Sequence, residues 1–421
     1  MNKLISFTLF TLLSVVSLFA TNGDNLIGLG TSSRAMGGTG IAHFSAGSSA
    51  TGNPALITFS KGGEFTFGAT YLSPSVNVRT NDTNGANDLS ALSDAKKNTI
   101  PYAALTHNLD NGWSVGGSIF GAAGMGTDWT KGDGAISNPL IGDVGLYSMK
   151  SSLTMLKISA PVAYKWNDWS FGIAPVMVFG TLHMSFISPT IGLVDNNSSS
   201  NAGFGFELGS VYNYSPLGLS FGIVYHSPVS LSYKDQISSL STAFGYGTQD
   251  SNFEIMSDTL EQPAEYGIGI DWTRGDLSVT ADYRSILWGE AEGYKDFNWE
   301  NQDVYSIGGE YRINELALRC GYNYGKNPIK VNNDTTVVSP ASPATNGDVI
   351  NTFNHVMFPA ITETHYTIGV GYQFNNAVGG DLALTFATSP EVTVSAKSIG
   401  LGNVSVSNEQ YSASAAINVV F

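Results

Sequence analysis

Charged and imidazole side chains recur at alternate positions of the predicted strands, where they could carry acid–base chemistry or bind a charged ligand. His226 and His365 lie on the polar faces of two different predicted strands, but neither has a nearby motif that places a serine nucleophile and an acid around it. No metal-ligand spacing or phosphate-binding loop is present in the sequence. We therefore predict no catalytic residue, no metal and no cofactor. The charged positions are Glu207, His226, Glu265, Asp271, Asp282, Arg284, Glu310, Arg312 and Arg319.

Three of these residues are arginines that could meet a carboxylate headgroup, because a guanidinium binds carboxylates in a two-pronged geometry. They are Arg284, Arg312 and Arg319. The interpretation that we favour is that they pair with neighbouring acids or anchor a segment inside the protein.

These side chains must be positioned by strands, because the dominant pattern is alternation of apolar and polar residues in segments of about ten. In one segment Tyr266, Ile268 and Ile270 alternate with Glu265, Gly267, Gly269 and Asp271. The polar face is dominated by Gly, Ser, Thr and Asn rather than by Lys and Glu. That composition is typical of an enclosed lumen and not of a surface in bulk water.

Fourteen such strands can be counted, and the connections between them alternate between short and long. An even strand number, with short turns on one side and long loops on the other, is typical of a bacterial outer-membrane barrel. The predicted strands start near Phe65, Tyr102, Trp113, Leu153, Trp169, Phe204, Leu217, Ala264, Leu277, Val304, Leu316, His365, Leu382 and Tyr411.

Composition supports a membrane barrel and excludes other classes. Aromatic residues make up 11% of the chain and charged residues only 13%, about half the usual share. A net charge of −15 without a basic stripe disfavours nucleic-acid binding. The single cysteine, Cys320, excludes an internal disulfide.

The ends of the chain indicate export and membrane assembly. Residues 1–20 contain Lys3 and an apolar run, which predict a secretory signal peptide ending near Ala20. The retained-anchor alternative is disfavoured because the run is short for a spanning helix. The last strand ends in Phe421, which resembles the signal read by the outer-membrane barrel assembly machinery.

Between the signal and the first strand lies a segment too rich in Gly, Ser and Ala to form a packed helix or strand of its own. Such a segment can pack tightly inside a larger structure. We therefore predict an all-β fold: a 14-stranded antiparallel transmembrane β-barrel (residues 63–421) plugged by an N-terminal hatch (residues 21–62).

This hatch resembles that of the FadL/TodX family of outer-membrane transporters, which import long-chain fatty acids and hydrophobic hydrocarbons. The resemblance extends through the middle strands and over essentially the whole mature protein. The matching residues are Gly28-Leu29-Gly30, Arg34-Ala35, Gly37-Gly38, Ala42 and Asn53-Pro54-Ala55-Leu56, then Ile100-Pro101-Tyr102, Trp113 to Ser118 and Gly369 to Phe374.

The resemblance implies a hatch that gates the lumen through Arg34, Asn53, Pro54 and Ala55. It also implies a kink in the third strand that opens sideways into the membrane. Here that strand breaks into a glycine-rich run at Gly121, Gly124 and Gly126, which permits a bulge. The alternative is that these glycines merely begin a loop.

Apolar residues near the kink and in the long loops are candidate ligand contacts. They could form a capture groove, or they could be how large loops pack on one another. The loop at 186–202 is short for the helical arm of the fatty-acid members, so a hydrocarbon or another neutral substrate is plausible. The candidates are Phe120, Met125, Leu140, Ile141, Ile191, Phe353 and Phe358.

The expected function is passive transport of hydrophobic compounds, either long-chain fatty acids or hydrocarbons, across the bacterial outer membrane. The expected partners are a hydrophobic small-molecule ligand, outer-membrane lipid and the assembly machinery, with the protein a monomer. The main alternative is a general porin for polar solutes, which predicts an unblocked lumen. An adhesin-like structural barrel is a further alternative.

Overall fold

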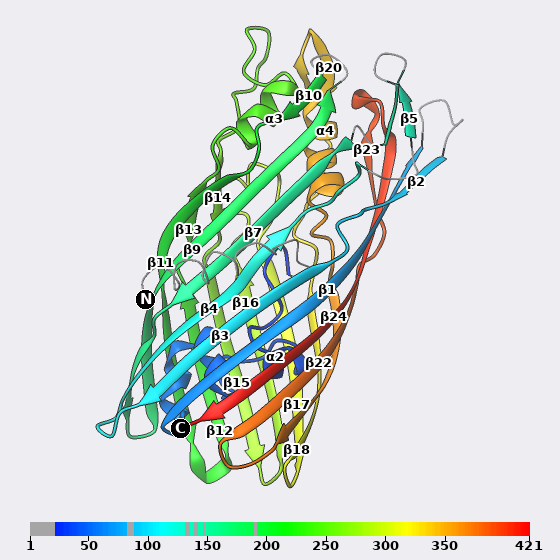
Figure 1. The fold of residues 1–421 in the computed structure, drawn as a ribbon. Helices are drawn as coiled ribbons and strands as arrows, with labels where there is room; N and C mark the ends of the chain where they lie inside the picture. The colour runs from blue at the N-terminus through cyan, green and yellow to red at the C-terminus, as the bar shows by residue number, and fades with distance from the viewer. Residues whose placement is uncertain (1–21, 82–87, 131–134, 139–141, 146–147, 189–191) are drawn as a thin grey trace, which may run out of the picture.

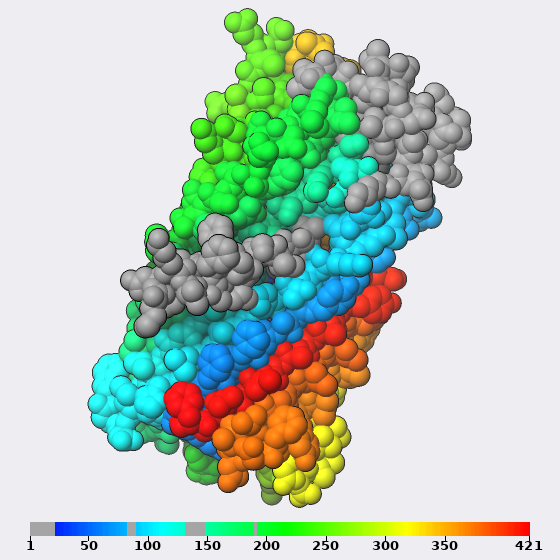
Figure 2. Space-filling view, in the orientation of Figure 1, coloured from blue at the N-terminus to red at the C-terminus, as the bar shows by residue number. Residues whose placement is uncertain are grey.

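The computed structural model describes residues 22–81, 88–130, 135–138, 142–145, 148–188 and 192–421. The predicted signal peptide lies outside the described residues. Strands form a tilted antiparallel barrel in which β1 (Gly63–Asn81) pairs with β24 (Gly402–Val420), closing the wall between the two ends of the chain. Figure 2 shows these first and last strands side by side. The fourteen-stranded barrel prediction is confirmed.

The remaining wall strands follow in chain order, each paired with its neighbour. They are β3 (Asn98–Asn108), β4 (Trp113–Met125), β7 (Lys150–Ser159) continued by β8 (Val162–Trp166), β9 (Trp169–Ser188), β11 (Ser199–Tyr214), β12 (Leu219–His226), β15 (Glu265–Arg274), β16 (Leu277–Ile286), β17 (Gln302–Ile313), β18 (Leu316–Gly325), β21 (Thr364–Gln373) and β22 (Val378–Thr388).

The two faces of the wall follow the predicted alternation. In β15 the side chains of Tyr266, Ile268 and Ile270 are exposed on the outer face, whereas Glu265 and Asp271 are buried inside. Burying the apolar face in lipid removes it from water, and the inward polar groups find partners in the lumen. The predicted faces of this strand are thus confirmed.

Short turns lie at one end of the barrel and the long connections at the other (Figure 1). The long connections carry β2 (Asp88–Leu92), β10 (Gly192–Asp195) and β23 (Val392–Ala396), three small hairpins, and short helices. The hairpins are β5 (Ala135–Asn138) with β6 (Gly142–Gly145), β13 (Val229–Ser232) with β14 (Thr259–Gln262), and β19 (Val337–Ser339) with β20 (Ser342–Thr345); the helical elements are α3 (Ile237–Ala243), α4 (Asn346–Thr352), the π-helix η5 (Phe353–Met357) and the 3₁₀ turn η6 (Lys397–Ile399). The 3₁₀ turn η4 (Ser215–Leu217) forms the short connection between β11 and β12.

Residues 22–60 lie inside the lower half of the barrel, drawn in dark blue in Figure 1. This segment contains α2 (Thr31–Ala35), η1 (Gly47–Thr51) and η2 (Pro54–Phe59). Helix α2 packs on β21 and β22, and η2 packs on β8, β9 and β11. None of the described helices combines the length and the apolar character that a membrane span needs.

The upper half of the lumen is filled by a large apolar core built from loops and upper strand ends. Its members include Met125, Leu153, Leu182, Leu231, Tyr233, Leu260, Trp288, Tyr294, Phe297, Trp299, Phe353, Val356, Met357 and Phe358. Dense packing of this kind leaves few voids larger than a water molecule. We call this group the outer core.

Candidate ligand pathway through the barrel

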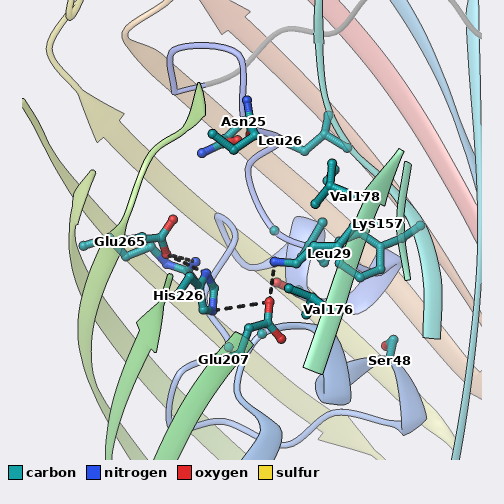
Figure 3. A pocket seen from close by; sticks show the side chains of 18 of the residues that line it. Asn25, Leu26, Leu29, Ser48, Lys157, Val176, Val178, Glu207, His226 and Glu265 are labelled. Carbon is teal, nitrogen blue, oxygen red and sulfur yellow. Dashed lines mark hydrogen bonds and ion pairs between the residues drawn. The ribbon is translucent and has the colours of Figure 1, made fainter. Parts of the chain in front are cut away.

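A cavity of about 100 Å³, which we call the main cavity, lies between the hatch segment and the wall formed by β4, β7, β9, β11, β12, β15 and β16 (Figure 3). One part of its lining is apolar and the other part is charged. The apolar residues are Leu26, Leu29, Phe120, Val176 and Val178; the charged or titratable ones are Lys157, Glu207, His226, Glu265 and Arg284.

The charged side chains of this cavity are paired with one another. Lys157 forms an ion pair with Glu207, and Arg284 Nη1 lies 2.8 Å from Glu265 Oε1. His226 stands between the two acids, 3.8 Å from a carboxylate oxygen of each. When His226 is neutral, the two carboxylates and the two cations of this cavity sum to no net charge. The charge of Arg284 is therefore balanced by Glu265 and is not available to a ligand headgroup.

A second buried ion-pair group lies on β17, β18 and β22. Arg319 Nε lies 2.6 Å from Glu310 Oε2, and its Nη1 lies 2.5 Å from Asp381 Oδ1. Arg312 also pairs with Glu310, at 2.6 Å, but its side chain is 57% exposed. The interpretation that the arginines pair with neighbouring acids is therefore confirmed for all three candidates.

Two lumenal aspartates hold the hatch segment to the wall. Asp282 Oδ2 accepts hydrogen bonds from the backbone N–H groups of Gly40 (2.7 Å) and Ile41 (3.0 Å). His43 Nδ1 lies 2.7 Å from Asp271 Oδ1. Hydrogen bonds to a carboxylate are stronger than neutral ones, so these contacts fix the middle of the segment.

The predicted gating residues fall at two places in the hatch segment. Arg34 is buried; its Nη1 donates to Thr70 Oγ1 (2.6 Å) and its Nε to Gly28 O (3.1 Å). Burial lowers the pKa of Arg34 to about 10, which still leaves it charged at neutral pH. Arg34 thus ties the first turn of the segment to β1.

The Asn53-Pro54-Ala55 turn is seated against the opposite wall. Asn53 Oδ1 accepts from Ala55 N (3.0 Å), and its Nδ2 donates to Ile41 O (2.7 Å). A Cβ at Gly172 of β9 would overlap the backbone of Pro54, and one at Gly209 of β11 would overlap Asn53. Glycines in the wall therefore leave room for this turn to dock closely.

Strand β4 has the break that its glycines predicted. Its pairing with β3 ends at Phe120, and its register with β7 shifts between Gly121 and Ala123, which is a β-bulge. Gly126 follows the strand end with a φ of +153°, a conformation that favours glycine. The alternative that these glycines only begin a loop is wrong for Gly121 and Gly124, which lie within β4.

The edge of β4 that β3 leaves unpaired is covered by the start of the hatch segment. Leu26 N donates to Ala122 O (3.2 Å), and Gly124 N donates to Asp24 O (3.0 Å). Residues 24–26 thus pair with the kinked part of β4 as a short extra strand. We call residues 22–26 the latch.

The latch is held from the lumen side by Asp24, a residue that sequence reasoning did not single out. The buried Asp24 carboxyl accepts a hydrogen bond from the Tyr294 hydroxyl and lies 3.4 Å from Gln262 Nε2. Burial raises the pKa of Asp24 to about 7. Next to it, a Cβ at Gly23 would lie 2.6 Å from the Trp288 ring. Polar residues are common after a signal peptide, so the position of Asp24 in the sequence does not indicate this role.

The predicted ligand contacts are partly brought together. Phe120 lines the main cavity, whereas Met125, Phe353 and Phe358 line a separate void of about 20 Å³ in the outer core. Phe353 stacks on Phe297 with ring centroids 3.7 Å apart, so this cluster packs loops together. The candidates Leu140, Ile141 and Ile191 lie outside the described residues.

Comparison with known proteins identifies the family. Residues 17–345 match the family model described as outer membrane protein transport protein (OMPP1/FadL/TodX). An Escherichia coli long-chain fatty acid transport protein is 32% identical over 163 residues, which are 37% of this chain and 32% of that protein. An uncharacterized Chlorobium limicola protein is 43% identical over 84 residues, 20% of this chain and 40% of that protein. The alignments thus span less than half of either relative.

Solved structures share the fold at low sequence identity. The Pseudomonas putida toluene transporter TodX superposes with a TM-score of 0.66 at 18% identity, covering 95% of this chain and all (100%) of that one. A Pseudomonas aeruginosa FadL homologue gives 0.67 at 15% identity, covering 94% and 99%. The Ralstonia pickettii toluene transporter TbuX gives 0.62 at 20% identity, covering 94% and 99%. The chain is thus a β-barrel of the bacterial outer membrane and belongs to the OMPP1/FadL/TodX family.

Proposed function

We propose that this protein is a passive outer-membrane transporter for hydrophobic compounds, in which the latch gates an exit at the kink of β4. The observation that carries the proposal is the pairing of residues 24–26 with residues 122–124 of β4. This pairing covers the break in the wall, and the main cavity lies directly beside it, lined by Leu26, Phe120 and Ala122. Withdrawal of the latch would connect the cavity with the membrane.

Sideways release suits an apolar cargo on energetic grounds. Each CH₂ group kept out of water is worth about 0.8 kcal/mol, so release into the periplasm would be costly for a hydrocarbon. Release through Gly121, Gly124 and Gly126 into lipid avoids that cost. A polar solute gains nothing from this path, and the filled lumen does not favour the porin alternative.

Within the hatch we propose a division of labour between the predicted gating residues and the latch. Asn53, Pro54 and Ala55 are docked against wall glycines, and Arg34 is tied to β1, so these four act as the fixed base. Among the described residues, the latch is joined to β4 by two backbone hydrogen bonds and is held further by Asp24, by Gly23 and by the packing of Leu26 on Leu72 and Ile100. With no anchor to a wall glycine or to a lumenal carboxylate, it is the part that we propose moves.

The size of the main cavity favours a small substrate. An apolar cavity of about 150 Å³ is known to accept benzene. This cavity of about 100 Å³ is apolar only on the side of Leu26, Leu29 and Phe120, so it suits a single ring lying on that side better than a long alkyl chain. Two of the similar structures are toluene transporters, whereas the E. coli relative is named for long-chain fatty acids. We propose a neutral monoaromatic compound as the first substrate to test.

The remaining partners follow from the barrel. The exposed apolar outer face requires outer-membrane lipid, and the terminal strand ending in Phe421 fits recognition by the barrel assembly machinery. We propose a monomer, because the barrel wall closes within one chain.

Uptake of labelled toluene and labelled oleate into cells, with and without this protein, tests the proposal. We expect toluene uptake to depend on the protein, and the purified protein to show negligible steady conductance in planar bilayers. Protein-dependent uptake of oleate alone would move the substrate to fatty acids. Steady conductance without uptake of either compound would support a porin.

A further inference from the structure

The barrel wall has a second break, between β11 and the hairpin that follows β12. The ladder between β11 and β12 ends at the pair Glu207 and His226. One residue further, Ser227 N donates to Phe206 O (3.0 Å) and Ser227 Oγ accepts from Phe206 N (2.9 Å). Beyond this point β11 continues from Phe206 up to Ser199 without a ladder partner on that edge among the described residues.

Two prolines explain why the wall separates here. The registers His226 with Glu265 and Val229 with Gln262 place Pro228 opposite Pro263 across the hairpin. Proline cannot donate to a ladder, and facing prolines interrupt both strands at one level. The hairpin of β13 and β14 therefore forms a separate two-stranded sheet that bends into the lumen.

The bent hairpin lies against the inner face of β11, and glycines make room for it. A Cβ at Gly203 would lie 2.6 Å from both Ser230 O and Val229 Cγ1, and one at Gly205 would lie 2.7 Å from Val229 Cγ2. Val229 and Leu231 are accordingly buried. We call the closed contact between residues 199–206 of β11 and Val229–Ser232 of β13 the β11–β13 slot.

The slot is tied at both ends and free of hydrogen bonds between them. At the upper end Asn196 Nδ2 donates to Asp235 O, and Gln236 Nε2 donates to Asn197 O, both at 2.7 Å. At the lower end Phe206 and Ser227 are joined. Between these ties no hydrogen bond among the described residues links β11 to the hairpin. The eight strand residues 199–206 correspond to a slot about 23 Å long.

The main cavity reaches the lower end of this slot. Its lining includes Ser227, Val229 and Pro263 on the hairpin side and Val176 and Phe206 on the other. Phe206 lies on an outward-facing position and is 42% exposed, so the cavity extends to the barrel wall here. Above it, Phe204 is 75% exposed on the outer surface.

We propose that the β11–β13 slot is a second side opening, through which a neutral apolar ligand of about one aromatic ring passes between the main cavity and the membrane. This inference rests on the proposed transport function. Opening the slot separates the van der Waals contacts of Gly203 and Gly205 with Val229 and Ser230, and shifts Val229 and Leu231 within the outer core. Opening the β4 exit instead breaks the two backbone hydrogen bonds of the latch.

A reversible disulfide across the slot tests the proposal. In a Cys320→Ala background, Gly203→Cys with Val229→Cys places the two thiols across the middle of the slot, within reach of a disulfide. The matched control is Asn213→Cys with Ser220→Cys, a directly opposed pair at the laddered end of β11 and β12. Uptake of labelled toluene and oleate is measured for each protein, oxidised and then reduced.

We expect oxidation of the slot pair to lower uptake in part, because the β4 exit stays available, and reduction to restore it. The control pair should transport equally in both redox states. Restoration by reductant shows that the double variant is folded. Equal uptake by the oxidised and reduced slot pair, at a level above that of cells without the protein, would overturn the slot as a route. Absence of uptake by the unmodified chain would instead overturn the proposed function, and the slot with it.

Discussion

At the scale of single residues, Asp24 is the side chain whose ionisation is coupled most directly to the latch. Its carboxyl is fully buried, with a pKa raised to about 7 from an ordinary value of 3.8. The neighbouring hydroxyls of Tyr294 and Tyr233 have raised pKa values through burial, so they stay neutral over this range. Between about pH 4 and pH 7 the folded chain therefore retains a proton that the unfolded chain has lost.

This difference sets the sign of a pH effect on stability. Because the folded state binds the proton more tightly, the contribution of Asp24 falls as pH rises from about 4 to 7, by about 4 kcal/mol at most. We expect Asp24→Asn to remove this loss, so that the variant matches the native protein at pH 4 and is more stable at pH 8. The free energy of unfolding of both proteins, measured with urea in detergent micelles at the two pH values, tests this prediction. Parallel pH profiles for the two proteins would contradict the prediction.

Arg319 offers a second test at the residue scale. Its guanidinium joins Glu310 and Asp381, and removing it leaves the buried Asp381 without a cation and the buried Glu310 with only the exposed Arg312. We expect Arg319→Met to lower the free energy of unfolding by about 3–5 kcal/mol. Arg312→Ala is the matched control, because Arg312 pairs with the same Glu310 but is largely exposed; it should cost less than about 1 kcal/mol. Equal losses in urea unfolding would show that burial does not decide the effect.

At the scale of elements, β4 carries both a paired and a kinked part, and glycines occur in each. Gly124 is buried and donates its N–H to the latch, whereas a Cβ at Gly117 would meet open space. We expect Gly124→Val to slow toluene uptake without reducing the amount of assembled barrel, because the side chain obstructs the exit. Gly117→Val should leave uptake unchanged. If Gly124→Val transports at the native rate, the exit does not lie at this kink.

Sequence periodicity predicted the wall elements well because lipid and lumen impose opposite demands on alternate residues. Tyr266 and Glu265 differ in solvent preference, and neither can face the other way without cost. The glycine run likewise predicted the bulge of β4. These patterns are local, so each can be recognised within the sequence of a single strand.

Contacts between distant segments were not predictable in the same way. The pairing of residues 24–26 with β4 joins stretches about a hundred residues apart and leaves no periodic signal. The β13–β14 hairpin was not among the fourteen predicted strands. Its cues, Pro228 opposite Pro263 and glycines at inward positions of β11, acquire meaning only once the register is known.

At the scale of the whole molecule, the lumen is closed twice in series. The hatch segment fills the lower half, anchored by Asp282 and Asp271, and the outer core fills the upper half. The described voids of the outer core that Phe353 lines measure only about 10 and 20 Å³. Voids of this size hold about one water molecule each, so the outer core alone is enough to stop a hydrated ion.

This arrangement predicts how conductance responds when the closures are removed. We expect the intact protein, and a variant lacking residues 22–60, to show no steady porin-like conductance in planar bilayers, because the outer core still seals the upper lumen. Adding Phe353→Ala and Phe358→Ala to the deletion should open a steady channel. Asp282→Asn, which weakens the hatch anchor without deleting it, controls for misassembly and should stay closed. A steady channel in the deletion variant alone would show that the hatch, and not the outer core, is the seal.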